Sequence, residues 1–189
     1  MGFEQVVEQL AAGDPRLRLR ALQELRASAR SLSGEQRRRA SQHVTALVDD
    51  EQPFVRWNAA LTLGALGDES GLEALERLAR QDDHANTRLR AALGLALLGD
   101  PHAVRTLESL AWDPYTLADQ HPVRAFAALA LGMLADPAAL PALERLSGDE
   151  DPEVRWHATV SLGDVGDPAG VEVLSARASD PVPFVRAHT

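Results

Sequence analysis

One spacing recurs along this chain and limits what it can fold into. An Arg is followed by an Ala- and Leu-rich run and then, twelve positions after the Arg, by an Asp. The copies are Arg56 to Asp68, Arg88 to Asp100, Arg124 to Asp136 and Arg155 to Asp167. Successive arginines lie 31 to 36 residues apart, and Arg186 begins a further copy. A period of this size is typical of stacked supersecondary units, each of which contacts only its neighbours.

Each period contains two helical patterns. In the first, apolar residues such as Val55 and Leu63 recur at helical spacing, and the rest of the segment is also mostly apolar. A helix of this kind must pack between neighbours. The second, as in residues 72–81, has leucines on one face and charged residues on the other. The Gly67-Asp68 pair between them predicts a left-handed helix end followed by an N-cap. No segment alternates as a strand does, so the sequence predicts an all-α fold.

These recurring elements resemble the short bacterial HEAT-like repeat, a type also found in the phycobilin lyase family. A complete copy runs from Asp-Pro-Glu-Val-Arg at residues 151–155 to Gly-Asp-Pro at residues 166–168. The resemblance covers roughly residues 50–189. It implies a right-handed α-solenoid of stacked helix pairs, a HEAT-like or armadillo-like superhelix. It says little about function, since arrays of this kind have many roles.

The chain is expected to form a single array over residues 1–189. Residues 1–49 fit the period less well and predict divergent N-terminal capping helices near 3–12, 15–31 and 35–48. Residues 50–181 predict four repeats, and residues 182–189 the start of an incomplete fifth. The last complete pair would then expose apolar residues, because solenoid ends normally have a polar cap. We therefore expect a homodimer or a capping partner at the C-terminal end.

Composition excludes several classes of protein. The chain has 28 acidic and 19 basic residues, a net charge of −9 and no Cys, which excludes disulfides and thiolate metal sites. No apolar run reaches membrane-spanning length, so a cytoplasmic location without membrane contact is expected. Residues 1–39 carry eight Arg against five acidic residues. This basic segment leaves nucleic-acid binding as a weak alternative, which the acidic balance of the whole chain disfavours.

The regularly placed arginines have two interpretations. A row of Arg56, Arg88, Arg124, Arg155 and Arg186 could bind an anion. In proteins of the HEAT-like type, the matching Arg pairs with loop aspartates of its own or the adjacent repeat, and the resemblance implies the same role here. The acidic turns at 82–83, 149–151 and 180 supply such carboxylates. We favour the structural role, for which a guanidinium fork is well suited.

One long insertion interrupts the period. It follows Trp112, which is predicted to lie on an exposed helix face, and it contains Tyr115 and His121. Insertions in repeat arrays often lie on the binding side, and aromatic residues are enriched at interfaces. The alternative is that Trp112 and Tyr115 only pack the longer loop onto the array.

Little in the sequence supports catalysis. The six His residues form no His-x-x-x-His pair, no glycine loop of the phosphate-binding type occurs, and no metal site or cofactor is predicted. Deoxyhypusine hydroxylase is a HEAT-like metalloenzyme that uses His-Glu pairs, and this chain contains none.

The favoured function is therefore a non-catalytic scaffold that binds a polypeptide partner on the concave face, formed by the second helices. The alternative is a bilin-lyase-like subunit that handles a tetrapyrrole and its acceptor protein. The predicted partner-binding residues are Glu73, Arg77, Arg80, His102, Arg105, Ser109, Trp112, Tyr115, His121, Arg145 and Glu172.

Overall fold

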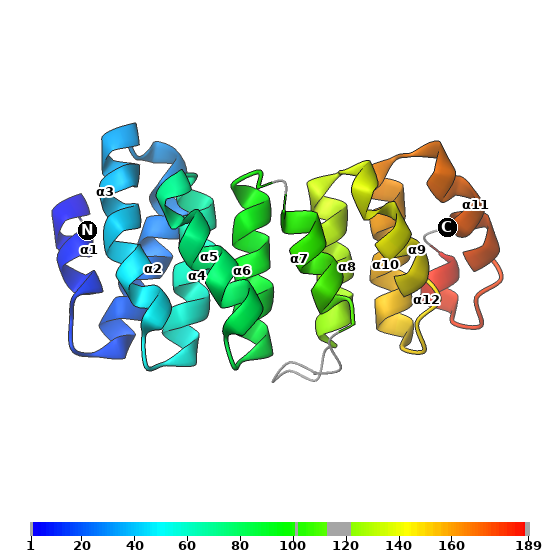
Figure 1. The fold of residues 1–189 in the computed structure, drawn as a ribbon, viewed down its shortest axis with the longest axis horizontal. Helices are drawn as coiled ribbons and strands as arrows, with labels where there is room; N and C mark the ends of the chain where they lie inside the picture. Colours follow the sequence, from blue (N-terminus) through cyan, green and yellow to red (C-terminus); the bar gives the residue numbers. More distant parts are fainter. Residues whose placement is uncertain (1, 101, 113–121, 188–189) are drawn as a thin grey trace. The chain divides into compact units, whose positions relative to one another are not determined.

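The computed structural model describes residues 2–100, 102–112 and 122–187, which are helical and contain no β-strand (Figure 1). The chain divides into two compact units, Met1–Ala103 and Val104–Thr189. Within each unit, consecutive helices joined by short turns form pairs, as the period predicts. The all-α fold expected from the sequence is confirmed.

The first unit consists of paired helices preceded by a short N-terminal helix. α4 packs between α2 and α6, and α5 packs against α6. The helices are α1 (Phe3–Leu10), α2 (Pro15–Ser28), α3 (Gly34–Thr45), α4 (Pro53–Leu66), α5 (Leu72–Gln81) and α6 (Ala85–Leu97), with short 3-10 turns at Ala29–Ser31, Ala46–Asp49 and Glu69–Gly71.

The second unit repeats this organisation. α10 packs against α8 on one side and α12 on the other, and contacts both α9 and α11. The helices are α7 (Ala103–Leu110), α8 (Val123–Leu134), α9 (Leu140–Leu146), α10 (Pro152–Val165), α11 (Pro168–Arg177) and α12 (Pro183–Arg186), with a 3-10 turn at Pro137–Ala139.

Local sequence explains where the helices begin and end. Gly67, Gly99 and Gly166 have φ near +70°, the left-handed conformation that glycine adopts without strain. Ala135 holds the same place in its repeat at φ 50°, a conformation that is unfavourable for a residue with a Cβ. At the start of α3, Ser33 and Gln36 form a reciprocal capping box, which satisfies two backbone N–H groups at this helix end.

The core is built from small residues and leucines. Val55, Leu63 and Leu66 of α4 are fully buried, as is Leu75 of α5. Burial of such a continuous apolar layer between stacked pairs is the main stabilising contribution to the fold.

The last pair is the exception. Val171 belongs to the apolar side that the sequence expects this pair to expose, and its exposed fraction is 59%. Among the described residues, only the four-residue α12 follows α11, and no later helix covers this side chain. The expectation of a dimer or a capping partner here stays a prediction.

Candidate functional site

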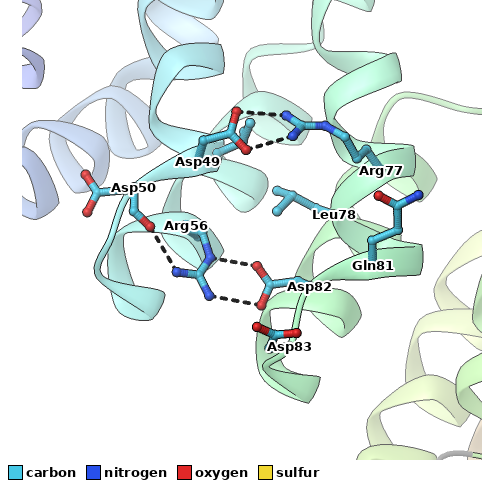
Figure 2. Close-up of a pocket in the computed structure, with 9 residues that line it drawn as sticks. Asp49, Asp50, Arg56, Arg77, Leu78, Gln81, Asp82 and Asp83 are labelled. Atoms are coloured by element: carbon cyan, nitrogen blue, oxygen red, sulfur yellow. Dashed lines mark hydrogen bonds and ion pairs between the residues drawn. The ribbon is translucent and has the colours of Figure 1, made fainter.

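The recurring arginine acts as a clamp between consecutive loops (Figure 2). Nε and Nη2 of Arg56 donate to the two carboxylate oxygens of Asp82 at 2.6 and 3.1 Å, while Nη1 donates to the carbonyl oxygen of Asp50 at 2.9 Å. Arg18 bridges the preceding loops in the same way, pairing with Asp50. The fork of each guanidinium thus holds one loop by its backbone and the next by its carboxylate.

The second unit repeats this clamp. Arg155 donates to both carboxylate oxygens of Asp180 at 2.8 and 3.1 Å and to the carbonyl oxygen of Asp149 at 3.0 Å. Arg124 donates in the same way to the carboxylate of Asp149, at 2.9 and 3.1 Å. We call these arginines and their loop aspartates the arginine ladder. They are satisfied within the fold, which favours the structural role over anion binding.

The ladder sets the charge state of its members. The hydrogen bond from Arg155 holds the pKa of Asp180 below its usual value of 3.8. Burial alone would raise the pKa of Asp82, but hydrogen bonds from Arg56 and from the backbone N–H of His84 outweigh it and lower that pKa. Both carboxylates are therefore ionised at neutral pH and remain paired.

The second-helix surface of the first unit is charged and open. Arg77 on α5 donates to both oxygens of Asp49 at 2.8 and 2.9 Å, and both side chains are about half exposed or more. This pair and the Arg56–Asp82 clamp line one groove of about 340 Å³ (Figure 2). The pKa of Asp49 is lowered by its hydrogen bond with Arg77. Glu73 and Arg80 of the same helix are exposed.

In the second unit an aromatic residue stands out. Trp112 is 64% exposed, and the guanidinium of Arg145 lies over its ring, 5.3 Å from the centroid. Arg145 also lines an open groove of about 650 Å³ between α9 and α11, together with Glu144, Glu172 and Arg177. One arginine thus connects an exposed aromatic ring to a groove of mixed charge.

The structure places the predicted partner-binding residues on the surface. Those within the described residues are exposed: Glu73, Arg77, Arg80, His102, Arg105, Ser109, Trp112, Arg145 and Glu172. Tyr115 and His121 lie outside the described residues. The structure adds Asp49, Glu144 and Arg177, which the helical pattern did not single out because it carries no information on which side chains meet between repeats. Partner binding by these residues stays a prediction.

Several of the basic N-terminal residues have partners within the first unit. Arg39 donates to both carboxylate oxygens of Glu4 at 2.7 and 2.6 Å, and Arg38 pairs with Glu35. Arg18 is held in the ladder. Pairing of this kind reduces the positive potential available to a phosphate backbone, so it weighs against nucleic-acid binding.

Comparison with known proteins assigns the family. The HEAT-repeat model matches residues 3–96, 46–121 and 115–189, which together span nearly the whole chain. The chain belongs to the HEAT-repeat family. No curated protein matches this HEAT-repeat chain significantly.

Solved structures agree with the fold. The complex of CpcE and CpcF of phycocyanin lyase from Nostoc sp. PCC7120 has a TM-score of 0.72 at 20% identity, covering 98% of this chain and 73% of that one. A designed armadillo repeat protein in complex with the peptide (KR)4 has a TM-score of 0.64 at 18% identity, covering 100% and 96%. At these identities the similarity establishes the repeat fold, which is common among interaction scaffolds. Among the described helices, none combines the length and apolar character needed to cross a bilayer.

Proposed function

We propose that this HEAT-repeat chain is a non-catalytic module that binds a polypeptide along the exposed face of its second helices. The observation that carries the proposal is the Trp112–Arg145 pair beside the groove between α9 and α11. A tryptophan that is 64% exposed costs solvation free energy that a partner would recover on covering it.

The groove's charges favour a polypeptide. Glu144 and Glu172 accept hydrogen bonds, while Arg145 and Arg177 donate them, and all four line the same groove. A peptide backbone presents both N–H donors and carbonyl acceptors, so this mixture can satisfy it. A polyanion would be repelled by the two carboxylates, Glu144 and Glu172. A designed armadillo repeat protein of similar fold is in complex with the peptide (KR)4, which supports peptide binding by this chain.

Substitution of the aromatic anchor tests the proposal. Peptides selected from a random display library on the immobilised protein serve as the probe. We expect Trp112→Ala to lose about 2 kcal/mol of affinity or more, as for an interfacial tryptophan, with an unchanged thermal melt. Titration calorimetry measures the first and circular dichroism the second.

Met133→Ala is the matched control. Met133 is 63% exposed, a fraction similar to the 64% of Trp112, but it lies on α8, which is the first helix of its repeat. It should leave affinity unchanged. Equal losses from both substitutions would contradict the proposed surface. Absence of selectable peptides, together with an absorbance change on adding a bilin, would instead support the lyase-like alternative.

A further inference from the structure

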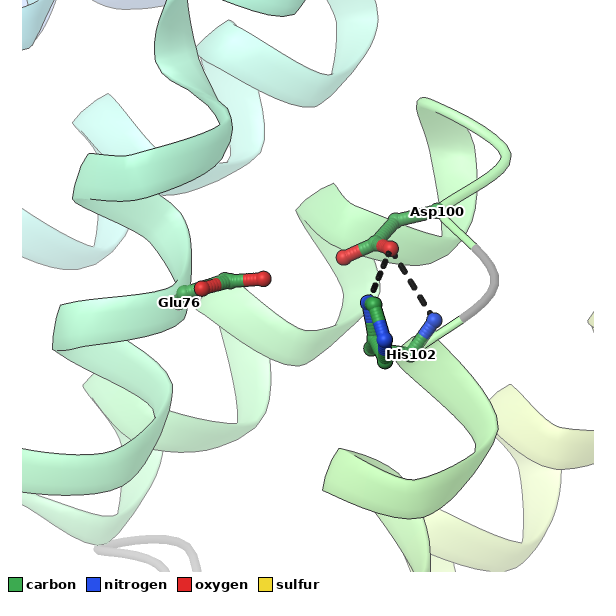
Figure 3. A group of neighbouring side chains, drawn as sticks. All are labelled: Glu76, Asp100 and His102. Atoms are coloured by element: carbon green, nitrogen blue, oxygen red, sulfur yellow. Dashed lines mark hydrogen bonds and ion pairs between the residues drawn. The ribbon is translucent and has the colours of Figure 1, made fainter.

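Three side chains with metal-ligating chemistry converge in the first unit (Figure 3). They are Glu76 on α5, Asp100 at the turn after α6, and His102 just before α7. One ligand atom from each lies within 4.8 Å of the others. They come from consecutive repeats, so the sequence alone does not bring them together.

Asp100 is the unusual member. Its side chain is only 6% exposed, and its Oδ1 accepts from the backbone N–H of His102 at 2.9 Å, as an N-cap does. Its Oδ2 is buried and has no hydrogen-bond donor among the described residues. In Figure 3 one oxygen of the Asp100 carboxylate points toward Glu76. A buried carboxylate oxygen without a donor is costly, and a cation satisfies it.

Charge supports the same conclusion. Glu76 and Asp100 bring two carboxylates together, and Arg80, on the same helix as Glu76, lies 4.0 Å from it and is 61% exposed. The imidazole Nδ1 of His102 lies 3.2 Å from Oδ1 of Asp100. A divalent ion between the three would offset the repulsion between the carboxylates.

His102 distinguishes this position from the corresponding positions in the other repeats. A cap aspartate also precedes the second helix at Asp68, Asp136 and Asp167, each accepting from the N–H two residues later. The glutamate equivalent to Glu76, eight residues after the cap aspartate, recurs as Glu108 and Glu144. Where this repeat has His102, the others have Ser70, Ala138 and Ala169. The third ligand is thus present only here.

We propose that Glu76, Asp100 and His102 bind one divalent transition-metal ion, with zinc as the best-matched probe. Two carboxylate oxygens and one imidazole nitrogen suit zinc, and imidazole favours it over magnesium. Three protein ligands leave a coordination position open for water or for a carboxylate of a partner. Glu76 is 34% exposed on a flexible side chain and can close the remaining distance.

Calorimetric titration of the full chain, untagged and treated with chelator, tests this site. We expect one zinc ion per chain, little heat with magnesium, and a higher melting temperature with zinc. His102→Ala and Asp100→Asn should each weaken zinc binding by at least about tenfold. Asn keeps the cap, so Asp100→Asn should fold normally.

His84→Ala is the matched control. His84 is 52% exposed and lies beside the buried Asp82, but Arg56 occupies both oxygens of that carboxylate. This variant should bind zinc as the wild type does. The proposal would be overturned if the wild-type protein bound no zinc. It would also be overturned if His102→Ala kept the wild-type zinc affinity and the same rise in melting temperature with zinc.

Discussion

At the scale of single residues, the ladder arginines contribute more than charge. The guanidiniums of Arg56 and Arg155 each satisfy a buried carboxylate of one loop and a carbonyl oxygen of another, so removal of either arginine leaves several acceptors unpaired. The resemblance to HEAT-like repeats implied this pairing, and the acidic turns at 82–83, 149–151 and 180 supplied the carboxylates.

Arg124→Ala tests the structural role. Arg124 and its partner Asp149 are 18% and 14% exposed, so the substitution leaves a largely buried carboxylate unpaired. We expect the free energy of unfolding to fall by about 2–3 kcal/mol in denaturant titrations. Peptide affinity of the folded variant should be unchanged.

Arg105→Ala serves as the comparison for that substitution. Arg105 is exposed on α7, and its loss should change stability by no more than about 0.5 kcal/mol. If Arg124→Ala left the melt unaltered but abolished peptide binding, the arginine would belong to the binding surface instead.

At the scale of helices, adjacent first helices approach closely through glycine. A Cβ added at Gly94 of α6 would lie 2.8 Å from the carbonyl oxygen of Ala60 in α4, and one at Gly64 would lie 2.7 Å from Cα of Gly94. The sequence predicted that these helices are buried on most sides. It did not identify the glycines as contact points, because glycine within an Ala-rich helix gives no periodic signal.

Gly94→Ala should therefore destabilise the fold by about 1–3 kcal/mol through overpacking against α4. Gly163 provides the opposite case, since it lies in α10 and a Cβ there meets nothing within 4 Å. Gly163→Ala should stabilise by up to about 1 kcal/mol, because alanine is the better helix former. Thermal melts of both variants measure the contrast, and equal shifts would contradict the packing account.

At the scale of the whole molecule, the repeat period predicted the all-α fold and the exposed positions of the second helices. It could not predict contacts that depend on side-chain reach, such as Arg145 over Trp112 or Asp100 near Glu76. Those contacts join side chains from different repeats, at distances set by packing. The division into two compact units was also not foreseen, because the period continues through residue 103.

We propose that a polypeptide binds over Trp112 on the second-helix face. The chain's three tryptophans allow a direct test, because each indole N–H gives its own NMR signal, assigned by single Trp→Phe substitutions. On titration with a selected peptide, the Trp112 signal should shift, while Trp57 and Trp156, half-buried on first helices, should stay in place. Shifts at Trp57 or Trp156 with an unmoved Trp112 would contradict the claim.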